Sequence, residues 1–328
     1  MKRKLGYILL AIGAIIIILA SLGIRKFNKA LFKERANSLI YTAELKPIHF
    51  DWTNDSIGTY FEAQTALIIP LKFECLPHHF YVQFDTGSPD SYIYEKSLNS
   101  LQQIGLKAKI LEKEDAKYVE NLHFTLGGNS IKASMIKILP NYGNTFDEND
   151  TLKNIKIGTI GSDFIDNRIT AIDFENQRIQ VYDERPEWMK TLKGFTPFDF
   201  TGRRIMLPVI LNNENYEFLY DSGCSAFGLI TTKNRFNKYT DENTETIAYG
   251  ANSWGNSIPI TSKLSNQAFT MGNATLSLKR VSYVDLYTAM QPLMTPFTRI
   301  GGWLGNQPLN EHTMVLDAKT EEFIIIKQ

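Results

Sequence analysis

Two blocks of sequence occur twice in this chain, and this duplication constrains the fold more than any other feature. The segment at 66–94, ALIIPLKFECLPHHFYVQFDTGSPDSYIY, has a counterpart at 204–230, RIMLPVILNNENYEFLYDSGCSAFGLI. A second segment at 158–182, GTIGSDFIDNRITAIDFENQRIQVY, matches GWLGNQPLNEHTMVLDAKTEEFIII at 302–326 without a gap. Because both blocks recur in the same order and at similar separation, the chain is predicted to contain two lobes of the same topology.

From about Thr65 onward the chain consists of short apolar or alternating runs separated by Gly, Asn and Pro. Such runs are typical of β-strands joined by tight turns, and only LNSLQQIGL and RPEWMKTL favour short helices. The predicted fold class is therefore all-β. The predicted boundaries are a first lobe at 65–182, an interlobe connection at 183–202 with two prolines, and a second lobe at 203–328.

The N-terminus carries the apolar run LGYILLAIGAIIIILASLGI at 5–24, which contains no charge and is long enough to span a bilayer as a helix. A cleaved signal peptide is the competing interpretation, but Ser21-Leu22-Gly23 lacks the small-x-small pattern of a cleavage site. The sequence thus predicts a short tail at 1–4, a single transmembrane helix at 5–24 and a juxtamembrane segment at 25–64.

The orientation of this helix stays open on charge alone, because Lys and Arg residues lie on both sides of it. A short tail followed by a large domain is typical of a signal anchor. We therefore expect a single-pass membrane protein whose folded domain is extracytoplasmic.

Charge and motif content argue against several classes of function. Thirty-five basic residues balance 35 acidic ones, so no nucleic-acid partner is predicted. The sequence has no zinc-type Cys/His spacing, no Walker A motif and no Gly-x-Gly-x-x-Gly, so neither a metal nor a cofactor is predicted. Two cysteines, Cys75 and Cys224, are too few for a disulfide scaffold, and a bond between them is not expected.

In each copy of the first block, an apolar strand is followed directly by an aspartate and then by a turn that contains a glycine. The motifs are Asp-Thr-Gly-Ser at 85–88 and Asp-Ser-Gly-Cys at 221–224, and each is followed later by an apolar-Gly signal, TIG at 159–161 and WLG at 303–305. In this combination the chain resembles the pepsin-like aspartic proteases. Its residue pattern is also similar to retropepsin-like sequences of bacterial proteins. Those proteins usually supply one catalytic aspartate per chain, whereas this chain carries both aspartates.

The resemblance covers about residues 65–328 and implies a bilobal fold of two similar β-barrel-like lobes with a cleft between them. It implies that Asp85 and Asp221 are the catalytic pair. Two carboxylates a hydrogen bond apart share one proton, so that one can activate water while the other polarises the scissile carbonyl. The implied substrate is a peptide or protein segment bound in an extended conformation along a β edge.

The resemblance also implies residues that support the two carboxylate loops: Thr86, Gly87, Ser88, Gly161, Ser222, Gly223, Cys224 and Gly305. The hydroxyls at the second motif position would brace the loops against each other, and the motif glycines would allow a close approach of backbone. Cys224 stands where the family has a hydroxyl, and a thiol is a weaker hydrogen-bond donor.

In the family a hairpin of the first lobe carries a Tyr-Gly pair that closes over the substrate as a flap. By position this hairpin lies in AKILEKEDAKYVENLHF, where Tyr118 is the only tyrosine and hence the flap candidate. A Tyr-Gly pair occurs instead in the second copy, within YGANSWGN at 249–256.

Together these features predict a membrane-anchored aspartic endopeptidase of bacterial type. The alternative is a catalytically inactive peptide-binding module that uses the same cleft, which Cys224 and the missing first-lobe Tyr-Gly pair favour. A structural β-sandwich that carries the motifs by chance is a third interpretation, and it requires Asp85 and Asp221 to lie far apart.

Overall fold

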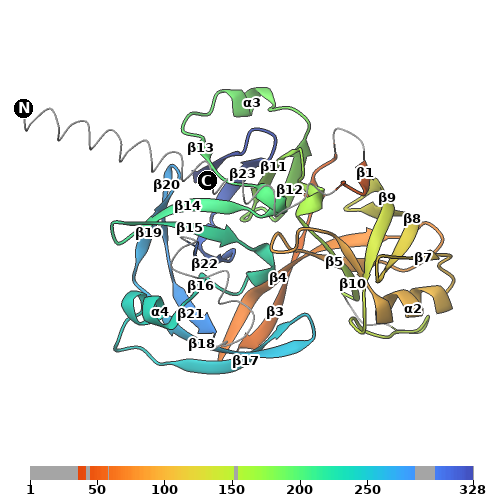
Figure 1. The fold of residues 1–328 in the computed structure, drawn as a ribbon, viewed down its shortest axis with the longest axis horizontal. Coiled ribbons are helices and arrows are strands. Elements are labelled where there is room, and N and C mark those ends of the chain that lie inside the picture. The colour runs from red at the N-terminus through yellow and green to blue at the C-terminus, as the bar shows by residue number, and fades with distance from the viewer. Residues whose placement is uncertain (1–35, 42–44, 58, 151–153, 285–299, 328) are drawn as a thin grey trace, which may run out of the picture. The chain divides into compact units, whose positions relative to one another are not determined.

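The computed structural model describes residues 36–41, 45–57, 59–150, 154–284 and 300–327. The predicted tail at 1–4 and the predicted membrane-spanning helix at 5–24 lie outside these ranges. Within them, no helix is both long enough and apolar enough to cross a bilayer. Asn37–Gln328 forms one compact unit, which is built mainly of β-strands arranged in three sheets (Figure 1).

The first sheet defines the first lobe. Its strands are β1 (Leu39–Tyr41), β3 (Asp51–Ile57), β4 (Tyr60–Lys72), β5 (Phe80–Phe84), β6 (Tyr92–Tyr94), β7 (Lys109–Lys113), β8 (Ala116–Leu126), β9 (Asn129–Leu139) and β10 (Lys156–Ile160). They are ordered β1-β9-β6-β10-β5-β4-β8-β7, with β3 paired to β4. Helix α2 (Glu95–Gln103) follows β6 and overlaps the helix predicted at LNSLQQIGL.

The second sheet defines the second lobe. Its strands are β14 (Met206–Leu211), β15 (Glu214–Tyr220), β16 (Leu229–Thr231), β17 (Ile247–Ser253), β18 (Asn256–Leu264), β19 (Ala268–Met271), β20 (Ala274–Ser277), β21 (Arg280–Val284) and β22 (Ile300–Leu304). They are ordered β17-β18-β21-β16-β22-β15-β14-β19-β20. Helix α4 (Lys233–Tyr239) follows β16 and was not predicted.

The third sheet contains strands from both halves of the chain. They are β2 (Ile48–His49), β11 (Ile169–Asp173), β12 (Arg178–Tyr182), β13 (Thr196–Pro197), β23 (His312–Asp317) and β24 (Glu322–Lys327). The two copies of the second sequence block meet here, because β11 and β23 pair antiparallel with Ala171 opposite Val315. Helix α3 (Glu187–Lys190) lies in the predicted interlobe connection, at the helix expected for RPEWMKTL.

The duplicated sequence folds into duplicated topology. In the first lobe β5 pairs parallel with β10, which pairs antiparallel with β6. In the second lobe β15 pairs parallel with β22, which pairs antiparallel with β16. The preceding strand lies antiparallel to the motif strand in both lobes, as β4 to β5 and β14 to β15. The Asp-containing motifs therefore follow equivalent central strands.

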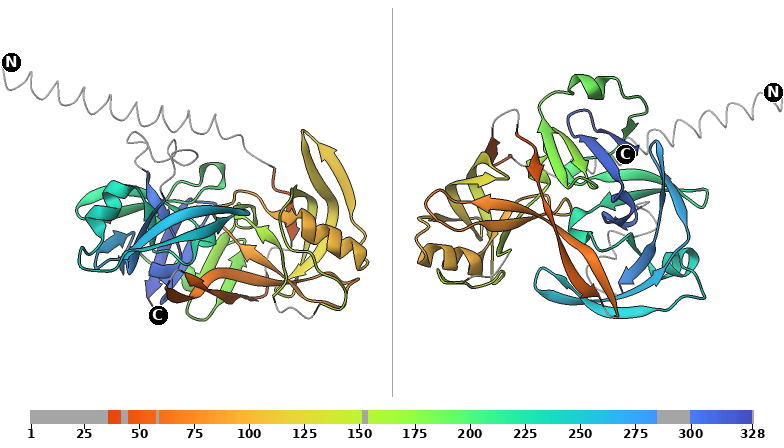
Figure 2. Two further views of the ribbon diagram at one scale, coloured as in Figure 1. Left: turned by 90° about the horizontal axis from the view of Figure 1, so that it is seen from below. Right: turned by 180° about the vertical axis from the view of Figure 1, so that it is seen from behind.

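The first lobe begins earlier in the chain than residue 65. Strands β1, β2 and β3 all precede that position and pair with β9, β12 and β4. Strands β1 and β2 are only three and two residues long, too short for a pattern. The hairpin of β3 and β4 is largely exposed near its turn, where alternate side chains are polar, and only the second half of β4 is a buried apolar run. This hairpin extends from the first lobe towards the second (Figures 1 and 2), where Tyr60 packs against second-lobe side chains.

Candidate active site

Asp85 and Asp221 stand at the ends of β5 and β15, and each carboxylate faces the other loop's glycine. A Cβ atom added to Gly87 would overlap the carboxylate of Asp221, and one added to Gly223 would overlap that of Asp85. The two side chains are hydrogen-bonded to each other. Glycine is therefore required at both positions by space, and the structure brings the two predicted aspartates together.

The two loops brace each other through the second residue of each motif. The backbone N–H of Thr86 donates to Oγ of Ser222 at 2.9 Å, and the N–H of Ser222 donates to Oγ1 of Thr86 at 2.9 Å. The hydroxyls then donate onward to carbonyl oxygens at the strand ends, Thr86 to Tyr220 at 3.1 Å and Ser222 to Phe84 at 2.9 Å. Since Thr86 and Ser222 are fully buried, these bonds are shielded from water.

Within each loop the glycine N–H donates to the carboxylate two residues earlier, Gly87 to Asp85 at 3.0 Å and Gly223 to Asp221 at 2.9 Å. The fourth motif position differs between the lobes. Sγ of Cys224 donates to Oδ2 of Asp221 at 3.1 Å, as expected for this position. The Ser88 hydroxyl instead donates to the carbonyl of Asp90 at 2.7 Å. The Ser88 hydroxyl thus stabilises its own turn and not the carboxylate, because the chain beyond Pro89 brings the Asp90 carbonyl within reach.

The electrostatic environment favours one shared proton on this pair. Burial raises the pKa of Asp85 well above its usual range, and the negative charge of Asp221 and the hydrogen bond with it raise it further. The backbone N–H groups of Gly87 and Ser88 oppose this shift. Burial also raises the pKa of the Cys224 thiol, with the charge of Asp221 adding to the effect, so the thiol stays protonated and able to donate.

The strands that carry TIG and WLG support the loops from behind. The backbone N–H of Asp85 donates to the carbonyl of Ile160, and that of Asp221 to the carbonyl of Leu304, both at 2.9 Å. A Cβ atom on Gly161 would overlap the carbonyls of the Asp85 loop, and one on Gly305 would overlap the carbonyls of Cys224 and Phe227. Both glycines therefore allow the supporting strand to lie against the carboxylate loop.

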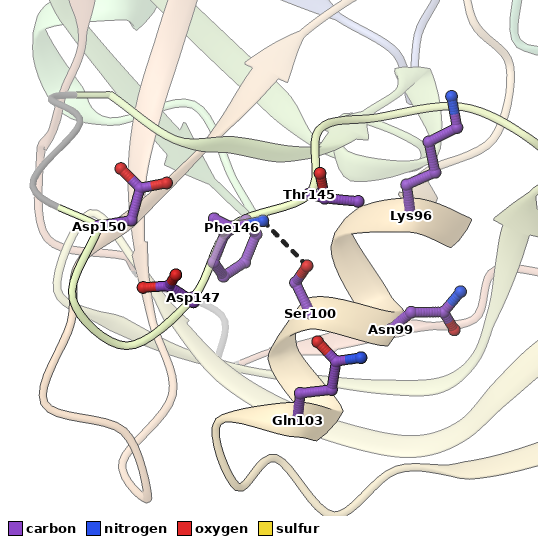
Figure 3. A pocket seen from close by; sticks show the side chains of 8 residues that line it. All are labelled: Lys96, Asn99, Ser100, Gln103, Thr145, Phe146, Asp147 and Asp150. Atoms are coloured by element: carbon purple, nitrogen blue, oxygen red, sulfur yellow. Dashed lines mark hydrogen bonds between the residues drawn. The ribbon is translucent and has the colours of Figure 1, made fainter.

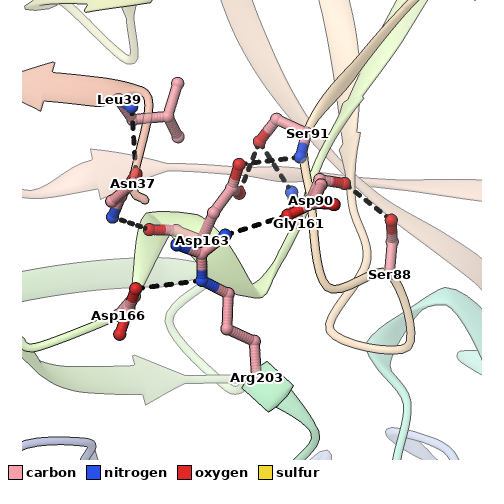
Figure 4. A network of polar contacts seen from close by, with 9 residues as sticks. All are labelled: Asn37, Leu39, Ser88, Asp90, Ser91, Gly161, Asp163, Asp166 and Arg203. Atoms are coloured by element: carbon pink, nitrogen blue, oxygen red, sulfur yellow. Dashed lines mark hydrogen bonds and ion pairs between the residues drawn. The ribbon is translucent and has the colours of Figure 1, made fainter. Parts of the chain in front are cut away.

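Sequence reasoning missed a polar network beside the first loop (Figure 4). Asp163 accepts two hydrogen bonds from Ser91, 2.8 Å from its N–H and 2.6 Å from its hydroxyl, and Ser91 in turn accepts the N–H of Gly161 at 3.0 Å. Asp163 is 5% exposed, and burial raises its pKa to about 6 although both bonds from Ser91 lower it. The sequence feature that could have revealed this network is Asp163 itself. It stands two residues after Gly161, whereas no acidic residue stands two residues after Gly305.

The same network contains Arg203, a buried arginine at the start of the second lobe. Its Nη1 lies 2.9 Å from Oδ1 of Asp90, and its Nε lies 2.9 Å from Oδ2 of Asp166. Asp90 lies in the turn that follows the Asp85 motif. Its ion pair with Arg203 ties the turn after Asp85 to the residues that connect the lobes.

Other predicted features lie elsewhere. Tyr118 is a half-buried residue of β8, opposite Leu111 on β7 and Lys137 on β9, and its role as a flap residue stays a prediction. Cys75 and Cys224 both carry free thiols. Across the part of the chain that the structure describes, His, Cys, Asp and Glu side chains do not gather in groups of three that would hold a metal.

A groove of about 540 Å³ lies on the first lobe between α2 and the loop after β9 (Figure 3). Its lining contains no residue of either carboxylate loop and is made by Lys96, Asn99, Ser100, Gln103, Thr145, Phe146, Asp147 and Asp150. The groove is therefore distinct from the carboxylate pair.

The similarity of this chain to known proteins is found among solved structures. No protein-family model matches it, and no curated protein matches it. Among solved structures it is similar to an aspartic proteinase from Irpex lacteus, with 13% sequence identity and a TM-score of 0.48; the match covers 86% of this chain and 97% of that one.

Proposed function

We propose that this chain is an aspartic-type endopeptidase. The observation that carries the proposal is the pairing of Asp85 and Asp221, which are hydrogen-bonded to each other on two loops locked by reciprocal bonds. Such rigid support suits catalysis, because a small misplacement of reacting groups is costly in rate.

In the proposed reaction Asp85 carries the shared proton and Asp221 is ionised. Asp221 takes a proton from a water molecule as its oxygen attacks the scissile carbonyl carbon, and Asp85 gives its proton to the carbonyl oxygen, which yields a geminal diol. Asp221 then passes its proton to the amide nitrogen as the C–N bond breaks, and Asp85 recovers a proton from one diol hydroxyl. Both carboxyl groups return to their starting states, and their titration belongs to the pair.

The proposed substrate is a peptide segment in extended conformation that pairs with a β edge near the two loops. We further propose that the charge-free run at 5–24 anchors the chain in a membrane, with the folded domain outside the cytoplasm.

The test uses the full chain in detergent micelles and a mixed peptide library between pH 3 and 8. The wild type is compared with Asp85→Asn and Asp221→Asn, and circular dichroism verifies that all three fold. Cleavage by the wild type and its loss in both variants would support the proposal. A folded wild type that cleaves no peptide at any pH in this range would contradict it.

The second candidate function, an inactive peptide-binding module, is favoured by one observation. Asp221 receives a thiol donor from Cys224 where a hydroxyl would bind more strongly. If this candidate is correct, peptides retained by the wild type without cleavage will also be retained by the Asp85→Asn variant.

A further inference from the structure

The hairpin of β17 and β18 contacts the flanks of both carboxylate loops. Near its base, the Tyr249 ring stacks on Phe227, which follows the Asp221 motif, with centroids 6.5 Å apart and planes at 6°. At its turn, Trp254 meets Tyr92, which follows the Asp85 motif, with centroids 5.9 Å apart. One second-lobe hairpin therefore reaches from the Asp221 side of the pair to the Asp85 side.

On the first lobe, Trp254 packs against a group of tyrosine side chains, Tyr92, Tyr142 and Tyr94, which we call the aromatic seat. Trp254 also contacts Tyr142 at 6.1 Å, and Tyr142 meets Tyr94 edge-on at 4.6 Å. Tyr94 is buried and its hydroxyl shares a 2.7 Å hydrogen bond with Thr159 of the supporting strand. Asn252 of the hairpin hydrogen-bonds Tyr142, whose pKa is raised by burial and, to a smaller degree, by the charge of Asp85. The seat thus lies close to the first carboxylate.

The turn of this hairpin is unusual for its sequence. Trp254 and Gly255 both have positive φ, at 51° and 87°, as a two-residue hairpin turn requires. Asn, Asp and Gly are favoured at such positions, whereas a bulky side chain with positive φ is an outlier that points to another constraint. A Cβ atom on Gly255 would come within 3.2 Å of the Tyr142 ring, so the turn itself lies against the seat.

The inward face of the hairpin is apolar. Tyr249, Ala251, Ile258 and Ile260 pack with a second-lobe cluster that we define as Ala226, Phe227, Ile230 and Trp303. Cys224, the donor to Asp221, packs against the same cluster. The hairpin therefore covers the loop of the second carboxylate.

The equivalent hairpin of the first lobe is different. It joins β7 and β8 through Glu114 and Asp115, which also have positive φ, and all of β7 is exposed. Its tip carries two charges where the second-lobe hairpin carries a Trp-Gly pair. The two copies of this element have thus diverged in the side chains that a closing hairpin would use.

We propose that the β17–β18 hairpin is the lid of the carboxylate site and that Trp254 is its latch, seated between Tyr92 and Tyr142. A peptide reaches the site when Trp254 leaves this seat, and it is enclosed when Trp254 returns. The inference rests on the proposed function for its substrate, whereas the opening motion itself does not depend on catalysis.

The test measures lid opening through Cys224, a half-buried residue that packs against the same apolar cluster as the hairpin. In a full-length Cys75→Ser background, the only remaining thiol is labelled by a small disulfide reagent at pH 8. Two aromatic contacts, with Tyr92 and with Tyr142, hold the latch. Trp254→Ala is therefore expected to accelerate the labelling of Cys224 about tenfold, and Trp254→Phe is expected to restore most of the protection.

The matched control is Trp188→Ala, which removes a tryptophan of similar exposure from α3, 44% against 40% for Trp254. Denaturant unfolding of each variant separates local opening from global destabilisation. Unchanged labelling in Trp254→Ala, or equal acceleration in Trp188→Ala, would overturn the lid. Peptide cleavage is measured in parallel. Faster labelling of Trp254→Ala without any cleavage by the wild type would refute the proposed protease activity and leave the lid intact. Cleavage by the wild type with unchanged labelling of Trp254→Ala would refute only the lid.

Discussion

Thr86 and Ser222 exchange hydrogen bonds at equal length, each N–H donating to the other's hydroxyl oxygen at 2.9 Å. This exchange joins two loops that lie more than a hundred residues apart in the chain, and it sets the separation of Asp85 and Asp221.

Replacing Thr86 with Val is expected to destabilise the protein by about 2–6 kcal/mol. The change keeps the shape but leaves the N–H of Ser222 and the carbonyl of Tyr220 buried without a partner, and each such group costs about 1–3 kcal/mol. Urea unfolding followed by fluorescence measures the loss. Thr125→Val is the control, since its hydroxyl makes only a long 3.5 Å bond to Lys72 in the same lobe. An equal loss in both variants would contradict the bracing role.

Gly87→Ala is expected to abolish cleavage in a chain that still folds, because the added methyl group overlaps the carboxylate of Asp221. The control is Gly128→Ala, where a Cβ atom meets nothing within 4 Å but φ is +81°. That control should cost about 1 kcal/mol of stability through backbone strain and leave cleavage intact. Full activity of Gly87→Ala would mean that the two loops lie further apart than described.

Asp163 should make the protein less stable as the pH rises from about 4 to about 6. Its folded-state pKa of about 6 lies above the ordinary value, so the native state binds this proton more tightly than the unfolded chain does. The stabilisation is complete below pH 4 and is lost above pH 6, with a size on the order of 2–3 kcal/mol.

Asp163→Asn should flatten this part of the stability profile, as measured by urea unfolding at closely spaced pH values. Asp55→Asn changes a carboxylate on the exposed half of the β3–β4 hairpin and should leave the profile unchanged. Parallel profiles for wild type and Asp163→Asn would show that other groups, such as Asp85, account for the whole slope.

Arg203→Met is expected to cost about 3–5 kcal/mol, because it removes the shared cation from Asp90 and Asp166 while Arg203 itself is only 6% exposed. Arg178→Met is the control. Arg178 is 43% exposed and lies 3.5 Å from Asp173, so its loss should cost less than 1 kcal/mol. Similar losses in the two variants would argue against a structural role for the Arg203 network.

Cys224→Ser is expected to extend cleavage to lower pH, and Cys224→Ala to restrict it to higher pH. A hydroxyl donates more strongly than a thiol to Oδ2 of Asp221 and thereby stabilises the ionised pair, whereas Ala removes the donor. The acid limb of the pH–rate profile measures the shift. Superimposable profiles for the three proteins would show that this donor does not tune the pair.

The duplication allowed the central part of the fold and the carboxylate pair to be predicted together. Two copies of an apolar strand ending in Asp-x-Gly lead to two equivalent sheets, and the structure places Asp85 and Asp221 at matching strand ends. The early strands β1 to β3 could not be predicted, since β1 and β2 are only three and two residues long, and β3 is largely exposed and polar and carries no periodic apolar signal. Ser88 could not be assigned either, because the direction of its hydroxyl depends on a turn geometry that begins at Pro89.

The sequence by itself determined the repeated local units: motif, strand alternation and the glycines that two tightly packed loops need. Only the tertiary structure decided which residues from different lobes meet. The pairing of Asp90 with Arg203 and the seating of Trp254 on Tyr92 and Tyr142 join positions far apart in the chain. Such contacts leave no local pattern, because they depend on how the two packed lobes are placed against each other and not on the conformation of either segment alone.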